Sequence, residues 1–242
     1  MTQRKPLLIL QTGDAPAVIQ QQHENYRQMF IHQGAISPQA LAVVHLPQGE
    51  RPGLPSGYSG VIITGSGAMV TDRLAWSEWA ADWLRQAVEI ALPVFGVCYG
   101  HQLLADMLGG VVDYHPQGME CGTKMLERLP GAERDPLCAA LPAHFTANLI
   151  HSQTVLEPPP GAQVLARSGH DPHQILRFNA TTFGTQFHPE FTGAVMKSYL
   201  RWQATLHPER QAALEAHPAR DTPFSQGLLQ AFVAGLGHGQ RE

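Results

Sequence analysis

The segment PVFGVCYGHQ around Cys98 constrains the fold more than any other part of the chain. An apolar run at residues 94–97 leads through Cys98 straight into an amphipathic pattern at residues 99–108. Gly96 and Gly100 stand two residues on either side of the cysteine. This is the pattern of a nucleophile elbow, a sharp strand-to-helix turn with a strained backbone at the nucleophile. Side chains two residues before or after the nucleophile would collide, so glycine is needed at each of these positions. It indicates an α/β fold with a buried strand ahead of the cysteine.

The first half of the chain repeats this alternation of buried strand and helix, which predicts a mostly parallel sheet with helices on both faces. Continuous apolar runs, typical of strands buried on both faces, occupy residues 7–11, 41–46, 61–64 and 94–97. Helical spacing occupies residues 17–32, 75–92 and 99–108. The second half changes to short runs that predict small antiparallel additions and a late return to the sheet, at residues 111–114, 123–126, 164–167, 174–178 and 182–187.

The chain is expected to form a single domain over residues 1–242, because it has no internal repeat and no linker. From Thr192 onward it reads as helical, with breaks at Pro208, Pro218 and Pro223.

Composition excludes several classes of function. A net charge of −4 argues against a nucleic-acid surface, and no apolar run is long enough to span a membrane. The apolar stretch at residues 7–10 is too short for a signal peptide. The three cysteines cannot all pair, and none has CxxC spacing. We therefore expect a soluble cytoplasmic protein without a disulfide scaffold.

The chemistry predicted for Cys98 is nucleophilic. The helix that follows it supplies partial positive charge, which favours a thiolate, and the amide of Tyr99 points to where an oxyanion would form. Cys121 and Cys138 have no elbow around them and are expected to be structural.

A cysteine nucleophile needs a base, and the base needs a group that orients it. The run TFGTQFHPE delivers His188 at the end of an apolar strand, with Glu190 two residues later. This predicts a triad in the order Cys98, His188, Glu190. Among the other histidines, His101 is expected to pack on its helix. The pair His170 and His173 is expected in a solvated turn, and no metal site is predicted.

The two motifs GVCYGHQ and FHPE together closely resemble those of the class I glutamine amidotransferases, the Cys-His-Glu glutaminase domains. The resemblance covers roughly residues 5–200 and leaves a helical C-terminal extension of about 201–242. It implies a flavodoxin-like fold and hydrolysis of a γ-glutamyl amide through a thioester. In that chemistry Cys98 is the nucleophile, His188 the general base and acid, and Glu190 the group that orients His188.

The same resemblance implies further site residues. The glycine-rich turn formed by Gly65, Ser66 and Gly67 would supply the second oxyanion-hole amide, and Ser66 replaces a glycine found in many members. Gly65 and Ser66 join Tyr99 as oxyanion-hole candidates, and Gly67 is a candidate for binding substrate. Gln102 would hold the amino-acid end of the substrate. Ser152 and Gln153 lie where members carry a substrate-binding loop, although an ordinary strand-end turn explains that segment equally well.

The leading hypothesis is an amidohydrolase without a cofactor that acts on glutamine or another small γ-glutamyl compound. Phrases such as ITGS and HSQ also resemble the stand-alone branch that includes γ-glutamyl peptidases. The first alternative is an ammonia donor for a separate synthase subunit, since the residues beyond about 200 are too few for a synthase. An acyltransferase on the same fold would share the triad. A non-catalytic binding module would be favoured by the loss of a triad residue, and none is lost.

Overall fold

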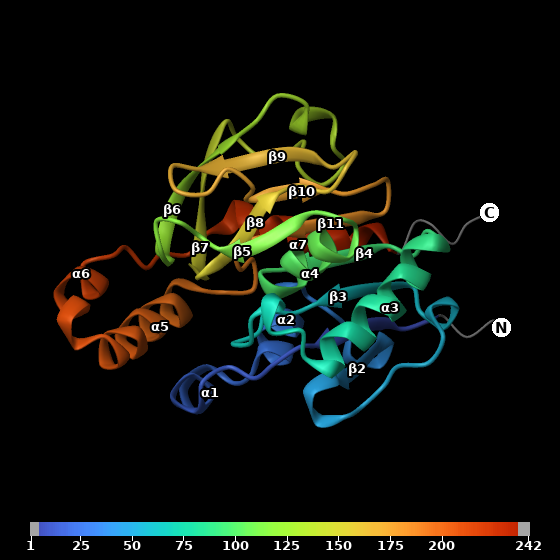
Figure 1. Ribbon diagram of the computed structural model, residues 1–242, viewed down its shortest axis with the longest axis horizontal. Helices are drawn as coiled ribbons and strands as arrows, with labels where there is room; N and C mark the ends of the chain where they lie inside the picture. Colours follow the sequence, from blue (N-terminus) through green and yellow to red (C-terminus); the bar gives the residue numbers. More distant parts are fainter. Residues whose placement is uncertain (1–4, 237–242) are drawn as a thin grey trace.

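A nine-stranded sheet with the order β2-β1-β3-β4-β11-β10-β9-β6-β7 forms the centre of the part of the chain that the computed structural model describes, residues 5–236. The five strands from β2 to β11 in this order pair in parallel, and the strands from β11 to β7 pair antiparallel (Figure 1). A separate pair, β5 and β8, is antiparallel. The strands are β1 (Leu7–Gln11), β2 (Leu41–His45), β3 (Gly60–Ile63), β4 (Val94–Val97), β5 (Val111–Tyr114), β6 (Glu120–Arg128), β7 (His144–His151), β8 (Gln153–Glu157), β9 (Gln163–Ser168), β10 (Ile175–Arg177) and β11 (Thr182–Thr185).

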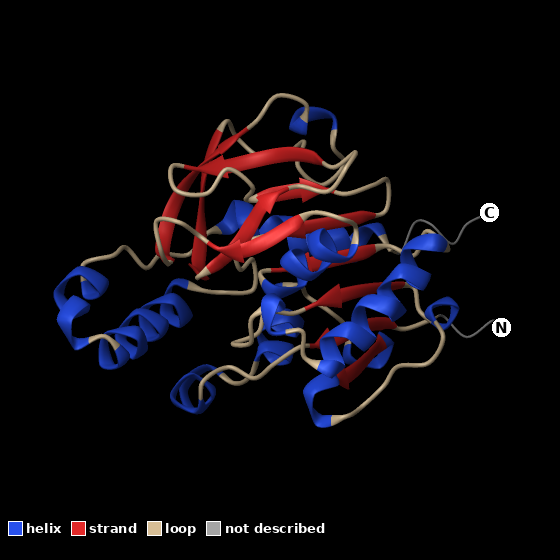
Figure 2. Ribbon diagram, viewed as in Figure 1, coloured by secondary structure: helices blue, strands red, loops and turns tan. Residues whose placement is uncertain are grey.

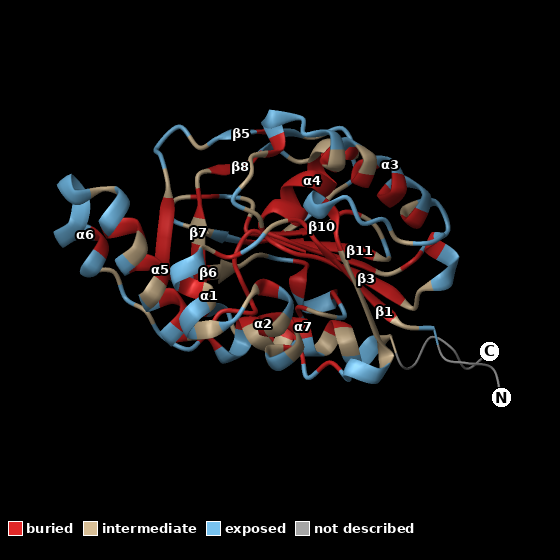
Figure 3. Cartoon of the chain, turned by 90° about the horizontal axis from the view of Figure 1, so that it is seen from below, coloured by how far each residue is buried: buried red, intermediate tan, exposed pale blue. Residues whose placement is uncertain are grey.

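Helices cover both faces of the parallel half of the sheet. Figure 3 shows α3 and α4 on one face and α2 and α7 on the other, while α5 and α6 extend to one side. The α-helices are α1 (Ala17–His23), α2 (Tyr26–Gln33), α3 (Ala75–Glu89), α4 (Tyr99–Met107), α5 (Gly193–Leu206), α6 (Gln211–Glu215) and α7 (Pro223–Gly235). Short 3-10 helices are η1 (Pro38–Ala40), η2 (Leu46–Gln48), η3 (Pro55–Gly57), η4 (Val70–Asp72), η5 (Ala132–Arg134) and η6 (Pro208–Arg210).

Alternation along the central strands gives the sheet an apolar layer on each side. Phe95 of β4 faces the layer that includes Phe232 of α7, whereas Val94 faces the layer of α3 and α4 with Leu84 and Leu104. All four β4 residues are buried, as expected for a strand covered on both faces. The predicted α/β architecture with antiparallel strands in the second half is confirmed (Figure 2).

Several boundaries differ from the sequence-based prediction. The single helix expected at residues 17–32 is divided into α1 and α2, because Glu24 adopts a positive φ of 66° and Asn25 caps the second helix. Strands β7 and β8 were not predicted. Within the described residues no helix is long and apolar enough to cross a membrane.

The C-terminal helices are part of the packed structure. α5 runs through residue 201, where the helical extension was expected to begin. α7 packs on the sheet near β7, and its residues Leu228, Leu229 and Phe232 are buried in the same apolar layer as Phe95.

Candidate active site

The backbone around Cys98 has the geometry of an elbow. Cys98 caps the N-terminus of α4 with φ 50° and ψ −100°, a conformation that L-residues rarely adopt. A Cβ added to Gly96 would lie 2.6 Å from the carbonyl carbon of Gly100. A Cβ on Gly100 would lie 2.7 Å from the Ile63 carbonyl oxygen. Both glycines are therefore needed for the close passage of β4 into α4.

The register of the sheet brings the two sequence motifs together. β4 and β11 are parallel neighbours in which Val97 pairs with Thr185, and the Cys98 amide donates to the Thr185 carbonyl at 2.8 Å. His188 follows three residues after Thr185, so it emerges at the same carboxyl edge of the sheet as Cys98. Open α/β sheets place their ligand sites at this edge.

His188 and Glu190 form a buried pair. His188 Nδ1 lies 2.7 Å from Glu190 Oε1, and both side chains are at most 3% exposed. The imidazole stacks on the Phe191 ring with 4.2 Å between ring centroids. Burial opposes a charge on the imidazole, but the negative charges of Glu190 and Cys98 outweigh it and raise the pKa of His188 to about 10.

The second imidazole nitrogen of His188 remains available. Within the described residues, Nε2 has no hydrogen-bond partner. His188 and Cys98 line the same cavity, which has a volume of about 290 Å³. A Cβ added to Gly65 would lie 2.9 Å from His188 Cε1 and 3.7 Å from Cys98 Cβ, so Gly65 packs between the two side chains. A histidine fixed on one nitrogen and open on the other can act on a group bound beside the cysteine.

Of the expected oxyanion-hole residues, Tyr99 and Ser66 line this cavity, and Gly65 is not among its described lining residues. The amide of Tyr99 is the first in α4, where amides have no partner within the helix. The Tyr99 hydroxyl is hydrogen-bonded to Ser77 Oγ at 2.6 Å, which fixes that side chain. Ser66 Oγ donates to the Thr12 carbonyl at 2.8 Å, so this hydroxyl fixes the glycine-rich turn against the end of β1. Ser66, Gly67 and Tyr99 all line the cavity.

The candidates for binding substrate divide into two groups. Gly67 and Ser152 line the cavity, and nothing lies within 4 Å of a Cβ placed on Gly67. Gln102 and Gln153 also line the cavity, but their side chains form hydrogen bonds to other residues of the protein. Gln102 Nε2 donates to the Gln153 carbonyl at 2.6 Å and to Gln186 Oε1 at 3.0 Å.

The Gln153 side chain braces η4. Its Oε1 accepts from the Val70 amide at 3.1 Å, and its Nε2 donates to Thr71 Oγ1 at 2.6 Å. Gln153 begins β8, so the segment expected as a loop is a tight passage from β7 to β8. Gln102 and Gln153 thus hold the wall of the cavity together.

Histidines outside the pair with Glu190 have other surroundings. His101 is fully buried against Phe178, and burial lowers the pKa of His101 to about 3, so the ring is neutral. His170 Nε2 is bonded to the Gly118 carbonyl at 3.0 Å, and its ring stacks on His115. His173 Nδ1 is bonded to the Val155 carbonyl at 2.6 Å.

One buried group has the residue types of a metal site. Ligand atoms of Glu120, His151 and Asp171 lie within 4.8 Å of one another. His151 Nε2 lies 3.1 Å from Glu120 Oε2, and its Nδ1 lies 2.9 Å from the Gln153 carbonyl. Gln174 Nε2 also donates to Glu120 Oε2, at 2.9 Å, whereas Ser168 donates to Glu120 Oε1 and Thr154 donates to Asp171 Oδ2. No sequence motif marks this group, because its members come from three separate segments.

A model of the class-I glutamine amidotransferase family matches residues 18–205, which is most of the chain. The chain belongs to this family. The match contains the Cys98 elbow and the pair of His188 and Glu190, so the family predicted from the two motifs is confirmed.

Curated relatives of the chain include two glutamine-hydrolyzing GMP synthases. The protein from Aeropyrum pernix is 35% identical over 132 residues, which is 54% of this chain and 24% of the relative. The protein from Thermomicrobium roseum is 38% identical over 131 residues, 54% of this chain and 23% of the relative. The matched region thus spans about a quarter of the length of these relatives.

Solved structures share the fold of this chain along its length. A glutamine amido transferase from Methylobacillus flagellatus has a TM-score of 0.72 at 22% identity and covers 99% of this chain and 100% of its own. A glutamine amidotransferase from Thermotoga maritima has a TM-score of 0.72 at 18% identity and covers 98% and 100%.

Residues that were not predicted from the sequence form part of the remaining cavity wall. They belong to segments before and after the two motifs: Asp14, Tyr26, Tyr199, Trp202 and Gln203. In the sequence they carry only the spacing of helix and loop residues, and no motif marks them.

Proposed function

We propose that this protein hydrolyses the γ-amide of glutamine or of a γ-glutamyl compound through a thioester on Cys98. The single observation that carries the proposal is the shared cavity of Cys98 and His188. In that cavity a strained cysteine stands at the N-terminus of α4, and the Nε2 of a histidine held by Glu190 has no hydrogen-bond partner among residues 5–236.

In the first step, Cys98 Sγ attacks the γ-carbonyl carbon and a C–S bond forms. A protonated imidazole beside the sulfur and the N-terminus of α4 both stabilise the thiolate. The oxyanion accepts hydrogen bonds from the Tyr99 amide and from the turn at Gly65 and Ser66. His188 Nε2 gives its proton to the leaving amine as the C–N bond breaks.

In the second step, His188 Nε2 takes a proton from water, and the water oxygen attacks the thioester carbonyl. The C–S bond breaks, glutamate leaves, and the proton remains on His188 beside the regenerated thiolate. Glu190 keeps Nδ1 protonated throughout, so that Nε2 alone exchanges protons.

A second candidate is an ammonia-donating subunit for a separate synthase. The observation that favours it is the similarity to a quarter of the length of two GMP synthases named as glutamine-hydrolyzing. The chemistry at Cys98 would be the same, and the released ammonia would serve the partner's reaction.

Glutamate release by the purified protein tests the proposal, with glutamine and a panel of γ-glutamyl peptides as substrates. Cys98→Ala should abolish release, whereas Cys138→Ala is the matched control, because Cys138 is buried outside the cavity. Rapid release from peptides favours a self-sufficient hydrolase. Slow release from glutamine alone, also dependent on Cys98, favours the ammonia donor. No release from any substrate would overturn the proposal.

A further inference from the structure

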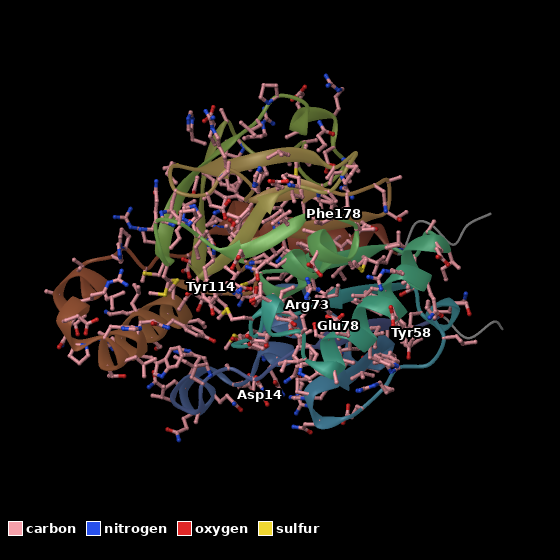
Figure 4. The ribbon with its side chains drawn as sticks, in the orientation of Figure 1. Asp14, Tyr58, Arg73, Glu78, Tyr114 and Phe178 are labelled. Carbon is pink, nitrogen blue, oxygen red and sulfur yellow. The ribbon has the colours of Figure 1, made fainter. Side chains whose placement is uncertain are left out.

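Asp14 is a carboxylate held in a fixed position at the wall of the cavity. It follows β1, and Figure 4 labels it below the sheet near α1. Its Oδ1 lies 2.8 Å from Gln11 Nε2, 2.6 Å from Asn25 Nδ2 and 2.9 Å from His45 Nε2. Among the described residues no hydrogen bond uses Oδ2, and the side chain is 42% exposed. One oxygen anchors the carboxylate and the other is available to a ligand.

The charge of Asp14 is not neutralised by a lysine or arginine. Its ion-pair partner is His45, and no lysine or arginine occurs among the described residues that line the cavity. Burial acts to raise the pKa of Asp14, but hydrogen bonds from Asn25 and His45 outweigh it and lower that pKa, so the group is ionised at neutral pH. The wall therefore presents a negative charge to whatever binds there.

The aromatic residues beside Asp14 favour the same kind of ligand. Tyr26, Tyr199 and Trp202 line the cavity, and the Tyr199 hydroxyl donates to the Tyr26 hydroxyl at 2.9 Å. Aromatic faces attract cations and repel anions. Burial, and to a smaller extent the negative charges of Cys98, Glu190 and Asp14, raise the pKa of Tyr26. Asp14, Tyr26 and Cys98 all line the same cavity.

Building on the proposed amide hydrolysis, we propose that Asp14 forms an ammonium subsite of the cavity and binds a primary ammonium group of the substrate. Two parts of a substrate could supply that group. One is the α-ammonium of the γ-glutamyl moiety, and the other is a second ammonium on the leaving amine. Both would lie against Asp14 Oδ2 and an aromatic wall.

Three amide substrates distinguish the two ammonium groups. γ-Glutamyl n-butylamide carries only the α-ammonium, the γ-glutamyl monoamide of 1,4-diaminobutane carries both, and glutaric acid mono-n-butylamide carries neither. If Asp14 binds the α-ammonium, Asp14→Asn lowers kcat/KM about tenfold for both γ-glutamyl amides and leaves the glutaric amide unchanged. If it binds the leaving amine, only the diaminobutane amide loses this factor. Asp82→Asn, an exposed change on α3, is the control. An equal effect of Asp14→Asn on all three amides, or no effect, overturns the proposal.

A second measurement does not depend on amide hydrolysis. Cys98 is modified with 2-aminoethyl methanethiosulfonate, which is cationic, or with neutral methyl methanethiosulfonate. Each forms a mixed disulfide and releases methanesulfinate, and peptide mass analysis separates Cys98 from Cys121 and Cys138. Asp14→Asn should lower the ratio of cationic to neutral rates about fivefold at low salt, while Asp82→Asn keeps the wild-type ratio. An unchanged ratio in Asp14→Asn contradicts the subsite even if the protein hydrolyses no amide. A lower ratio of cationic to neutral rates in Asp14→Asn supports the ammonium subsite independently of turnover.

Discussion

Among single residues of the site, Glu190 has the largest influence on the protonation of His188, because its negative charge raises the pKa of the imidazole. The carboxylate is fully buried at 2.7 Å from Nδ1, and His188 is also buried, so water screens the pair weakly. A raised pKa keeps the imidazole protonated at neutral pH, where it can stabilise a thiolate and give a proton to a leaving amine.

Glu190→Gln should reduce glutamate release about a hundredfold or more, because the histidine loses its charge partner and its orientation. The pKa of His188 should fall, because the charge of Glu190 is the largest of the influences that raise it. NMR titration of the ring, in protein with ¹³C-labelled histidine, measures this directly. An unchanged midpoint in Glu190→Gln would contradict the assignment of Glu190 as the orienting group.

The same pair makes stability depend on pH. His188 has a higher pKa in the folded protein than in the unfolded chain, so its contribution is fully present below about pH 6.5, the ordinary pKa of histidine. That contribution is lost as the pH rises through about 10. Urea unfolding should show that the stability advantage of wild type over Glu190→Gln shrinks from pH 7 to pH 10. A constant difference would show that the pair does not titrate as described.

At the scale of elements, the passage of β4 into α4 requires glycine at position 100. Gly100→Ala should lower the free energy of unfolding by about 1–3 kcal/mol, because the added methyl meets the backbone and side chain of Ile63. Gly227→Ala in α7 is the matched change, since nothing lies within 4 Å of its added Cβ. It should raise stability by about 0.5–1 kcal/mol. Equal effects in chemical denaturation would contradict the close packing of the elbow.

The side chain of Gln153 links β8 to η4, so we expect Gln153 to position the cavity wall without contacting the substrate. Gln153→Ala removes the bonds to Val70 and Thr71 and should lower kcat/KM about tenfold, because the cavity wall shifts. Hydrogen exchange at residues 68–72 should become faster. Gln163→Ala, an exposed change at the start of β9, should alter neither quantity. Normal exchange with reduced activity would instead indicate direct contact of Gln153 with substrate.

Elements with a strong periodic signal could be predicted from the sequence, and elements fixed by pairing could not. β1 and β4 are continuous apolar runs, and their predicted bounds match the structure. β7 carries polar residues such as Asn148, which is buried because its side chain bonds to Thr123 and to backbone carbonyls of distant segments. Those partners lie outside any local window, so the strand has no clear local pattern.

The same reasoning applies to the site. Cys98 and His188 sit in motifs whose residue types follow from the chemistry, and the sheet brings them together. Tyr199 reaches the cavity from α5 and Asp14 reaches it from the end of β1. Their position depends on how α1, α2 and α5 pack against each other, which the sequence pattern does not encode locally.

At the scale of the whole molecule, α7 closes one face of the sheet far along the chain from the strands that it covers. Leu229→Ala should lower the free energy of unfolding by about 2–5 kcal/mol, since Leu229 is fully buried in that layer. Phe224→Ala in the same helix should change it by less than about 0.5 kcal/mol, because Phe224 is 51% exposed. Denaturation measurements in urea compare the two. Similar losses would contradict the orientation of α7.

The central claim is that Cys98 carries the γ-glutamyl group during the reaction. The most direct test is acid quenching of the protein after mixing with radiolabelled glutamine, followed by peptide mapping. Label is expected on the peptide that contains Cys98. It should be released by hydroxylamine, as expected for a thioester, and be absent in Cys98→Ala. Glutamate release without label on that peptide, or labelling that persists in Cys98→Ala, would contradict it.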